Sequence, residues 1–160
     1  MIYTETEIKR VVEYFLMEVE GGRKNFARAI WAKFFRPKFA HVIGLSGNLG
    51  AGKTTFTKHL LEYLGFTGAV TSPTFVLRRD YNISRSRRPT SGKWEKIIHI
   101  DAYRLDNPIM IGQIISEEEL KDTKNLILIE WPEKLDLNIF DKIFLFEHVS
   151  SEERNISILK

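Results

Sequence analysis

The sequence predicts an α/β layered domain with a mixed, mainly parallel central sheet flanked by helices, and two observations carry this prediction. Residues 47–54 read GNLGAGKT, which fits G-x-x-x-x-G-K-[ST] between an apolar strand and a helix start. Short β-prone segments then alternate with helical ones. The fold class is therefore a P-loop NTPase-like layered domain. At 160 residues we expect a single domain, 1–160, with an N-terminal helical part at 1–38 and a nucleotide-binding core at 39–160.

Helices are expected where apolar residues recur at three- and four-residue steps. The segments are 4–20, 25–35, 54–64 and 116–120. The first begins with a capping box of Thr4 and Glu7, and the last begins with Ser116 as its N-cap. Gly65 ends the helix that follows the glycine-rich pattern.

Strands are expected where short runs are rich in β-branched and aromatic residues. The segments are 41–45, 75–81, 94–100, 126–130, 142–146 and 156–159. The polar stretch 82–93 contains Pro89 and Gly92, so we expect it to be a loop that joins an antiparallel pair. This pair makes the predicted sheet mixed rather than purely parallel.

Composition limits the class of protein. Hydrophobic residues make up 43% and charged residues 28%, as in soluble globular proteins. The chain has no cysteine, which excludes disulfides and thiolate metal sites. No apolar run approaches the roughly 20 residues that cross a bilayer, and the first residues lack the order of a signal peptide. We therefore expect a cytoplasmic protein without membrane contact, whose net charge of +3 suits polyanionic ligands.

The pattern at 47–54 predicts a phosphate-binding loop. Glycines let bare N–H groups turn inward around a phosphate. Lys53 would place its charge on the β- and γ-phosphates, and the Thr54 hydroxyl would be a magnesium ligand. The expected nucleotide-binding residues here are Asn48, Leu49, Gly50, Ala51, Gly52, Lys53, Thr54 and Thr55.

Two further acids end apolar strands, and such acids hold metal or water beside a P-loop. Asp101 follows IIHI and Glu130 follows LILI. Either one fits the metal, with the other acting on the attacking water. His99 fits a core or hydrogen-bonding histidine better than a catalytic one. In the turn before residue 75, Ser72 and Thr74 are candidates to contact the γ-phosphate.

The segment Arg85–Lys93 belongs to a basic stretch. A solvated loop is one interpretation, and contact with RNA or phosphate is the other. Tyr81 and Trp94 flank the loop and are candidates to stack on bases.

Four motifs occur in the order and spacing typical of one family. They are GNLGAGKTTF at 47–56, SPTF at 72–75, H-x-D-x-Y-R at 99–104 and IEWPE at 129–133. With these motifs the chain resembles TsaE, a family of small P-loop ATPases that take part in making N6-threonylcarbamoyladenosine in tRNA. Asn48 departs from the pattern, because the family usually has Asp after the first glycine.

The resemblance implies ATP and Mg²⁺ as cofactors and slow, partner-dependent hydrolysis. It implies roles for Lys53 and Thr54 on phosphate and metal, and for Asp101 and Glu130 at metal and water. It places Trp131 close to the nucleotide, and Arg154 before the last strand also matches the family. The implied partner is the TsaD–TsaB threonylcarbamoyl-transferase complex, with tRNA contacted indirectly or through the basic loop.

Two other functions fit the residues. A small-molecule kinase would use the basic loop as a lid over ATP and an acceptor. A nucleotide-gated RNA-binding module would depend on Arg85, Arg87 and Arg88 and not on Lys53. In the ATPase interpretation, Arg104 is an in-chain candidate for the positive charge that stabilises the transition state.

Overall fold

The computed structural model describes residues 1–20, 39–83, 93–105, 111–135 and 140–159. The strands are β1 (Ile2–Thr4), β2 (His41–Ser46), β3 (Arg78–Asn82), β4 (Lys96–Asp101), β5 (Asn125–Glu130), β6 (Lys142–His148) and β7 (Glu153–Ile158). The helices are α1 (Ile8–Val19), α3 (Lys53–Tyr63) and α4 (Glu117–Lys121), with short 3₁₀ turns η1 (Glu5–Glu7), η2 (Ile111–Gln113) and η3 (Pro132–Lys134). The expected helix at 25–35 lies outside the described residues.

The strands form one sheet in the order β1-β7-β6-β2-β5-β4-β3. Its centre is parallel, because β2 pairs with both β5 and β6, and β5 pairs with β4. Antiparallel strands close both edges, with β3 against β4 on one side and β7 between β6 and β1 on the other. The predicted fold class, a mixed sheet with a parallel centre and flanking helices, is confirmed.

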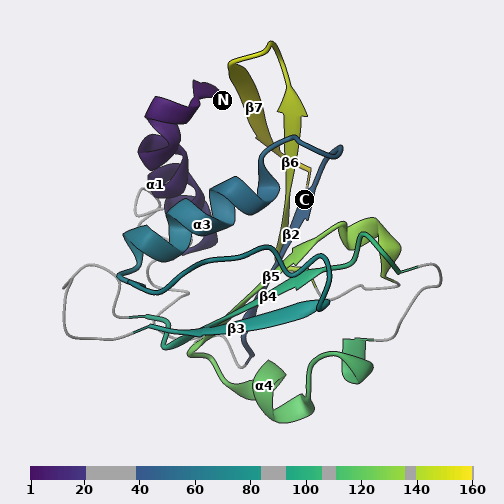
Figure 1. Ribbon diagram of the computed structural model, residues 1–160. Helices are drawn as coiled ribbons and strands as arrows, with labels where there is room; N and C mark the ends of the chain where they lie inside the picture. The colour runs from purple at the N-terminus through teal and green to yellow at the C-terminus, as the bar shows by residue number, and fades with distance from the viewer. Residues whose placement is uncertain (21–38, 84–92, 106–110, 136–139, 160) are drawn as a thin grey trace.

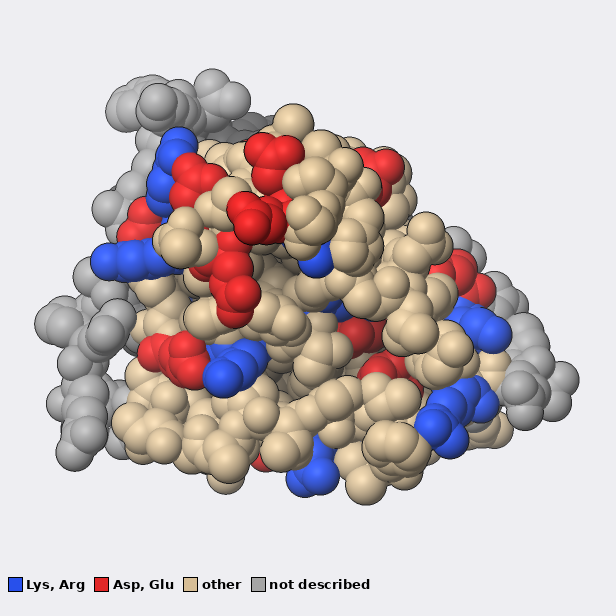
Figure 2. Space-filling model, turned by 45° about the horizontal axis from the view of Figure 1, so that its top comes forward, with Lys and Arg blue, Asp and Glu red and all other residues tan. Residues whose placement is uncertain are grey.

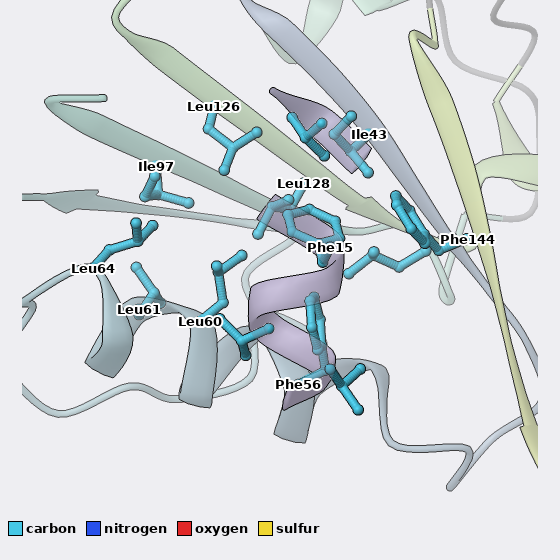
Figure 3. Packing of buried hydrophobic residues seen from close by; sticks show 14 of the residues in the cluster. Phe15, Ile43, Phe56, Leu60, Leu61, Leu64, Ile97, Leu126, Leu128 and Phe144 are labelled. Atoms are coloured by element: carbon cyan, nitrogen blue, oxygen red, sulfur yellow. The ribbon is translucent and has the colours of Figure 1, made fainter. Parts of the chain in front are cut away.

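Helices cover both faces of this sheet. α1 and α3 lie together on one face, and the shorter α4 lies on the other (Figure 1). The larger core fills the space under α1 and α3, where Phe15 meets Phe56 edge-on with ring centroids 5.0 Å apart. Figure 3 shows Phe15 of α1 and Leu60 of α3 directed at Leu128 and Phe144 on the sheet. Burial of these apolar side chains fixes α3, and with it the loop at its N-terminus.

Two local details differ from the sequence prediction. The short strand β1 was not expected, and it pairs with β7 at the sheet edge. The strand expected from residue 75 begins only at Arg78, because the residues before it form a turn in which Leu77 has a φ of 64°. Both expected capping motifs, at Thr4 and Ser116, are present. Among the described residues, no helix is long and apolar enough to span a membrane.

Candidate nucleotide site

The glycine-rich loop joins β2 to α3 at the carboxyl edge of the parallel strands. Gly47 has a φ of 136°, and a Cβ there would lie 2.2 Å from the carbonyl oxygen of Phe146. Only glycine fits both this conformation and this close approach to β6. The loop is therefore pressed against the neighbouring strand, and the N-terminus of α3 opens toward the same edge.

Lys53 is the first residue of α3 and lies inside the loop, with 4% of its side chain exposed. Its Nζ donates to the carbonyl oxygens of Gly47 at 2.6 Å and Asn48 at 3.0 Å. The ammonium also lies 4.3 Å from the centroid of the Trp131 ring. Burial lowers the pKa of Lys53 from its ordinary value, and nearby carboxylates, Glu130 foremost, oppose that shift. The charge of Lys53 is thus largely shielded from water. A shielded charge attracts a nearby anion more strongly than an exposed one does.

The two predicted acids lie side by side, because Asp101 and Glu130 are paired in the register of β4 and β5. Side chains alternate between the faces of a strand. Ile98 and Ile100 belong to the core on the α4 side, so His99 and Asp101 face α3. Both acids are nearly inaccessible, with 4% of Asp101 and 3% of Glu130 exposed.

Glu130 is held by two donors on one oxygen. The Thr54 hydroxyl donates to Oε1 at 2.8 Å, and Nε2 of His99 lies 2.8 Å from the same oxygen. His99 is fully buried, as the sequence analysis expected. Thr54 and Glu130 therefore form one cluster of oxygen ligands at the start of α3.

Asp101 uses both of its oxygens. The hydroxyl of Thr74 donates to Oδ2, and the backbone N–H of Tyr103 donates to Oδ1 at 3.0 Å. Thr74 is itself hydrogen-bonded to Ser72, with the two hydroxyl oxygens 2.6 Å apart. The SPTF turn is thus hydrogen-bonded to Asp101. Thr74 makes this contact directly, and Ser72 reaches the site through Thr74.

A cleft of about 200 Å³, the candidate phosphate cleft, opens between these groups. Its lining comprises Leu49, Gly50, Gly52, Lys53, Thr54, Thr55, Thr74, Asp101, Tyr103, Glu130 and Trp131. Figure 2 shows this end of the molecule hollowed, with acidic side chains in and around the hollow. Of the expected residues, Asn48, Ala51, Ser72 and Arg154 do not line this cleft. Tyr103 was not among the expected ligands, and its ring lies against Trp131 with centroids 5.1 Å apart.

A larger cleft of about 500 Å³ lies on the other side of the glycine-rich loop. It is lined by Tyr3, Thr4, Glu5, Thr6, Ile8, Gly50, Gly52, Thr55, Ser151, Glu152 and Arg154. Arg154 is therefore placed here, where its guanidinium donates to backbone carbonyls of the β6–β7 hairpin, including Ser150 at 3.0 Å. The N-terminal residues of this cleft carry no local sequence signal, because they approach the loop only when β1 pairs with β7.

The oxygen ligands suit magnesium rather than a metal that needs a closed protein cage. Among the described residues, no three His, Cys, Asp or Glu side chains gather as a metal site. Mg²⁺ prefers one or two carboxylates completed by phosphate and water. The Thr54 hydroxyl with Glu130, and Asp101 across the cleft, fit that preference.

The expectation that Tyr81 and Trp94 stack on bases beside the basic loop was wrong. Tyr81 and Trp94 are core residues with 5% and 2% exposure, so neither ring is available to stack on bases. Arg104 lies over the ring of Phe75, 4.3 Å from its centroid, and does not line the phosphate cleft. Residues 84–92 of the basic loop lie outside the described residues.

Comparison with known proteins agrees with the motifs. The family model described as threonylcarbamoyl adenosine biosynthesis protein TsaE matches residues 20–156. A Streptomyces coelicolor protein, named tRNA threonylcarbamoyladenosine biosynthesis protein TsaE, is 42% identical over 93 residues, which are 58% of this chain and 57% of the relative. A Rickettsia bellii protein of the same name is 35% identical over 119 residues, covering 74% of this chain and 73% of the relative.

The chain spans 57% and 54% of the Streptomyces and Haemophilus influenzae relatives. The crystal structure of Bacillus subtilis YdiB has a TM-score of 0.56 and 24% identity, and it covers 99% of this chain and 83% of its own. This likeness concerns the fold. The family match extends over most of the chain, so we conclude that the chain belongs to the TsaE family.

Proposed function

We propose that this chain is a Mg²⁺-dependent ATPase that acts in the biosynthesis of threonylcarbamoyladenosine in tRNA. One observation carries the proposal: Lys53, Thr54, Glu130 and Asp101 converge on a single cleft at the glycine-rich loop. A buried ammonium, a hydroxyl and two carboxylates are the groups that P-loop enzymes use on a nucleoside triphosphate. Membership of the TsaE family supports the assignment to tRNA modification.

The contacts favour different roles for the two acids. Glu130 is hydrogen-bonded to Thr54, the first candidate ligand, so we place it on the metal side. Asp101 is bound instead to Thr74 and to the backbone after β4, so we place it on the water side, where a carboxylate can accept a proton. Lys53 would neutralise the β- and γ-phosphates. Mg²⁺ held here would supply further charge to offset the developing negative charge.

The larger cleft is the proposed place for the nucleoside. It shares Gly50, Gly52 and Thr55 with the phosphate cleft, so a nucleotide can cross the loop from one to the other. Its walls carry the carboxylates of Glu5 and Glu152. A carboxylate accepts hydrogen bonds and cannot donate them. It can therefore accept a hydrogen bond from the exocyclic amino group of adenine.

Exposed apolar side chains at the phosphate cleft support a partner-dependent enzyme. Leu49, which lines the cleft, is 72% exposed, and Phe75, next to Thr74, is 82% exposed. Exposed apolar groups gathered beside a site are typical of protein contact. We propose that the TsaD–TsaB complex covers the opening of the phosphate cleft beside Leu49 and Phe75. We also propose that the protein acts in the cytoplasm. Contact with tRNA would be indirect or through the basic loop.

Nucleotide binding and hydrolysis test the proposal directly. We expect calorimetry to show ADP binding, and we expect slow ATP hydrolysis that rises when TsaD and TsaB are added. Lys53→Ala is the blank for both measurements. Absence of nucleotide binding would refute the P-loop assignment. Hydrolysis unaffected by the pair would refute the partner, and phosphate transfer to a metabolite would favour the kinase alternative.

The two acids are tested separately by Glu130→Gln and Asp101→Asn. Both variants should bind nucleotide, while turnover should fall about 100-fold because metal or water loses its carboxylate. Raising the Mg²⁺ concentration should restore part of the rate in Glu130→Gln and none in Asp101→Asn. Wild-type hydrolysis by both variants would contradict the roles assigned to them.

A further inference from the structure

His99 is a buried titratable residue that the proposed ATPase does not yet use. It lies on β4 two residues before Asp101 and has no exposed surface. Nε2 contacts Glu130 Oε1 at 2.8 Å, while Nδ1 is buried and has no hydrogen-bond partner in the described structure. One nitrogen is thus paired with the metal-side acid and the other with nothing.

Packing alone does not account for a histidine at this position. A buried polar nitrogen without a partner is destabilising, and a leucine of similar volume would avoid this cost. The contact to Glu130 also fixes the tautomer. A carboxylate only accepts hydrogen bonds, so Nε2 carries the hydrogen and donates it to Oε1.

The two donors on Oε1 leave the other oxygen of Glu130 available. The described residues provide no hydrogen bond to Oε2, and Glu130 lines the phosphate cleft. The Thr54 hydroxyl rotates and would also serve the metal, so its hold on Glu130 is adjustable. The imidazole is fixed within a β-strand, which makes it the rigid donor of the pair.

We propose that His99 is a positioning residue whose Nε2–H holds the Glu130 carboxylate in the orientation that serves the metal of a bound nucleotide. The inference rests on the proposed Mg²⁺–nucleotide function of the cleft. Groups that orient a metal-binding carboxylate from behind typically change metal affinity by 10- to 100-fold when they are removed. His99 would therefore act on the contribution of Mg²⁺ to binding and not on the nucleotide itself.

The test measures ADP affinity by calorimetry, once with Mg²⁺ and once with EDTA. In His99→Leu, the gain in affinity that Mg²⁺ confers should shrink by about 10-fold or more, while affinity in EDTA stays within about twofold of wild type. His99→Gln places an amide N–H near the original Nε2 and should regain most of the loss. His99→Asn is too short to reach Glu130 and should not regain it. This polar pair decides the question even if the leucine variant does not fold.

His41 provides the matched control, because it is another largely buried strand histidine with an unpartnered Nε2. It lies at the start of β2, at the far end of the strands from Glu130, so His41→Leu should leave the Mg²⁺ effect unchanged. In a Glu130→Gln background, His99→Leu should add no further loss, since both changes act through one carboxylate.

Two results would overturn the role of His99 and leave the proposed function standing. One is an unchanged Mg²⁺ effect in folded His99→Leu. The other is an equal loss of ADP affinity in EDTA and in Mg²⁺, which indicates general distortion of the site. If wild type gains no affinity from Mg²⁺, the proposed metal-dependent function fails and the role of His99 fails with it. If Gln and Asn behave alike, the hydrogen bond to Glu130 is not the cause, which also refutes the proposal.

Discussion

Replacing Lys53 with alanine removes a buried positive charge from the centre of the phosphate cleft. The change affects affinity in two ways, because the ammonium is lost and Glu130 and Asp101 remain as uncompensated negative charges. Two unit charges about 4 Å apart interact by about 4 kcal/mol at an effective dielectric constant of about 20.

Part of this energy is already spent in the free protein, where Nζ is bonded to two loop carbonyls. Each of the two bonds contributes about 0.5–1.5 kcal/mol net, so roughly 2 kcal/mol should remain. Since about 1.4 kcal/mol corresponds to tenfold in affinity, Lys53→Ala should weaken ADP binding by roughly 30-fold.

The assay is titration calorimetry with ADP, together with thermal unfolding of each protein. Lys58→Ala is the matched control, because Lys58 lies on the same helix but is exposed. We expect wild-type affinity from Lys58→Ala. The thermal unfolding curves show whether Lys53→Ala is folded at the temperature of the titration. Binding by Lys53→Ala within threefold of wild type, or an equal loss in Lys58→Ala, would refute the reasoning.

Two further predictions concern stability. Hydrogen bonds from Arg78 lower the pKa of Glu119 from 4.5 to about 2. The ionised Glu119 therefore stabilises the folded state fully above pH 4.5, and this stabilisation is lost as the pH falls toward 2. Urea unfolding between pH 6 and 2.5 should therefore show a shallower acid decline in Glu119→Gln, and parallel curves would contradict this. Gly47→Ala should destabilise the fold by more than the roughly 1–3 kcal/mol of a strained φ, because its Cβ meets the Phe146 carbonyl at 2.2 Å. Gly65→Ala, with a φ of 96° and open space, should cost only the backbone strain, and equal losses would remove the clash argument.

Local chemistry made several elements predictable. The capping boxes at Thr4 and Ser116 depend on residues three positions apart, so they can be read directly from the chain. The start of β3 was misplaced because residues 75–77 are apolar and strand-like, whereas the turn at Leu77 is set by its surroundings. The buried positions of Tyr81 and Trp94 were missed for a similar reason: an aromatic ring beside a polar loop packs inward or outward according to the helices that cover the sheet.

The sequence by itself determined the phosphate loop, the two strand-end acids and the family, because each depends on residue types at fixed spacing. Only the tertiary structure decided which groups meet. The register of β4 and β5 pairs Asp101 with Glu130, and the fully buried His99 reaches Glu130 because strand alternation directs both side chains toward α3. The pairing of β1 with β7 brings the N-terminal residues and Arg154 together beside the loop. Contacts between residues more than a hundred positions apart depend on sheet order and packing, which no local pattern encodes.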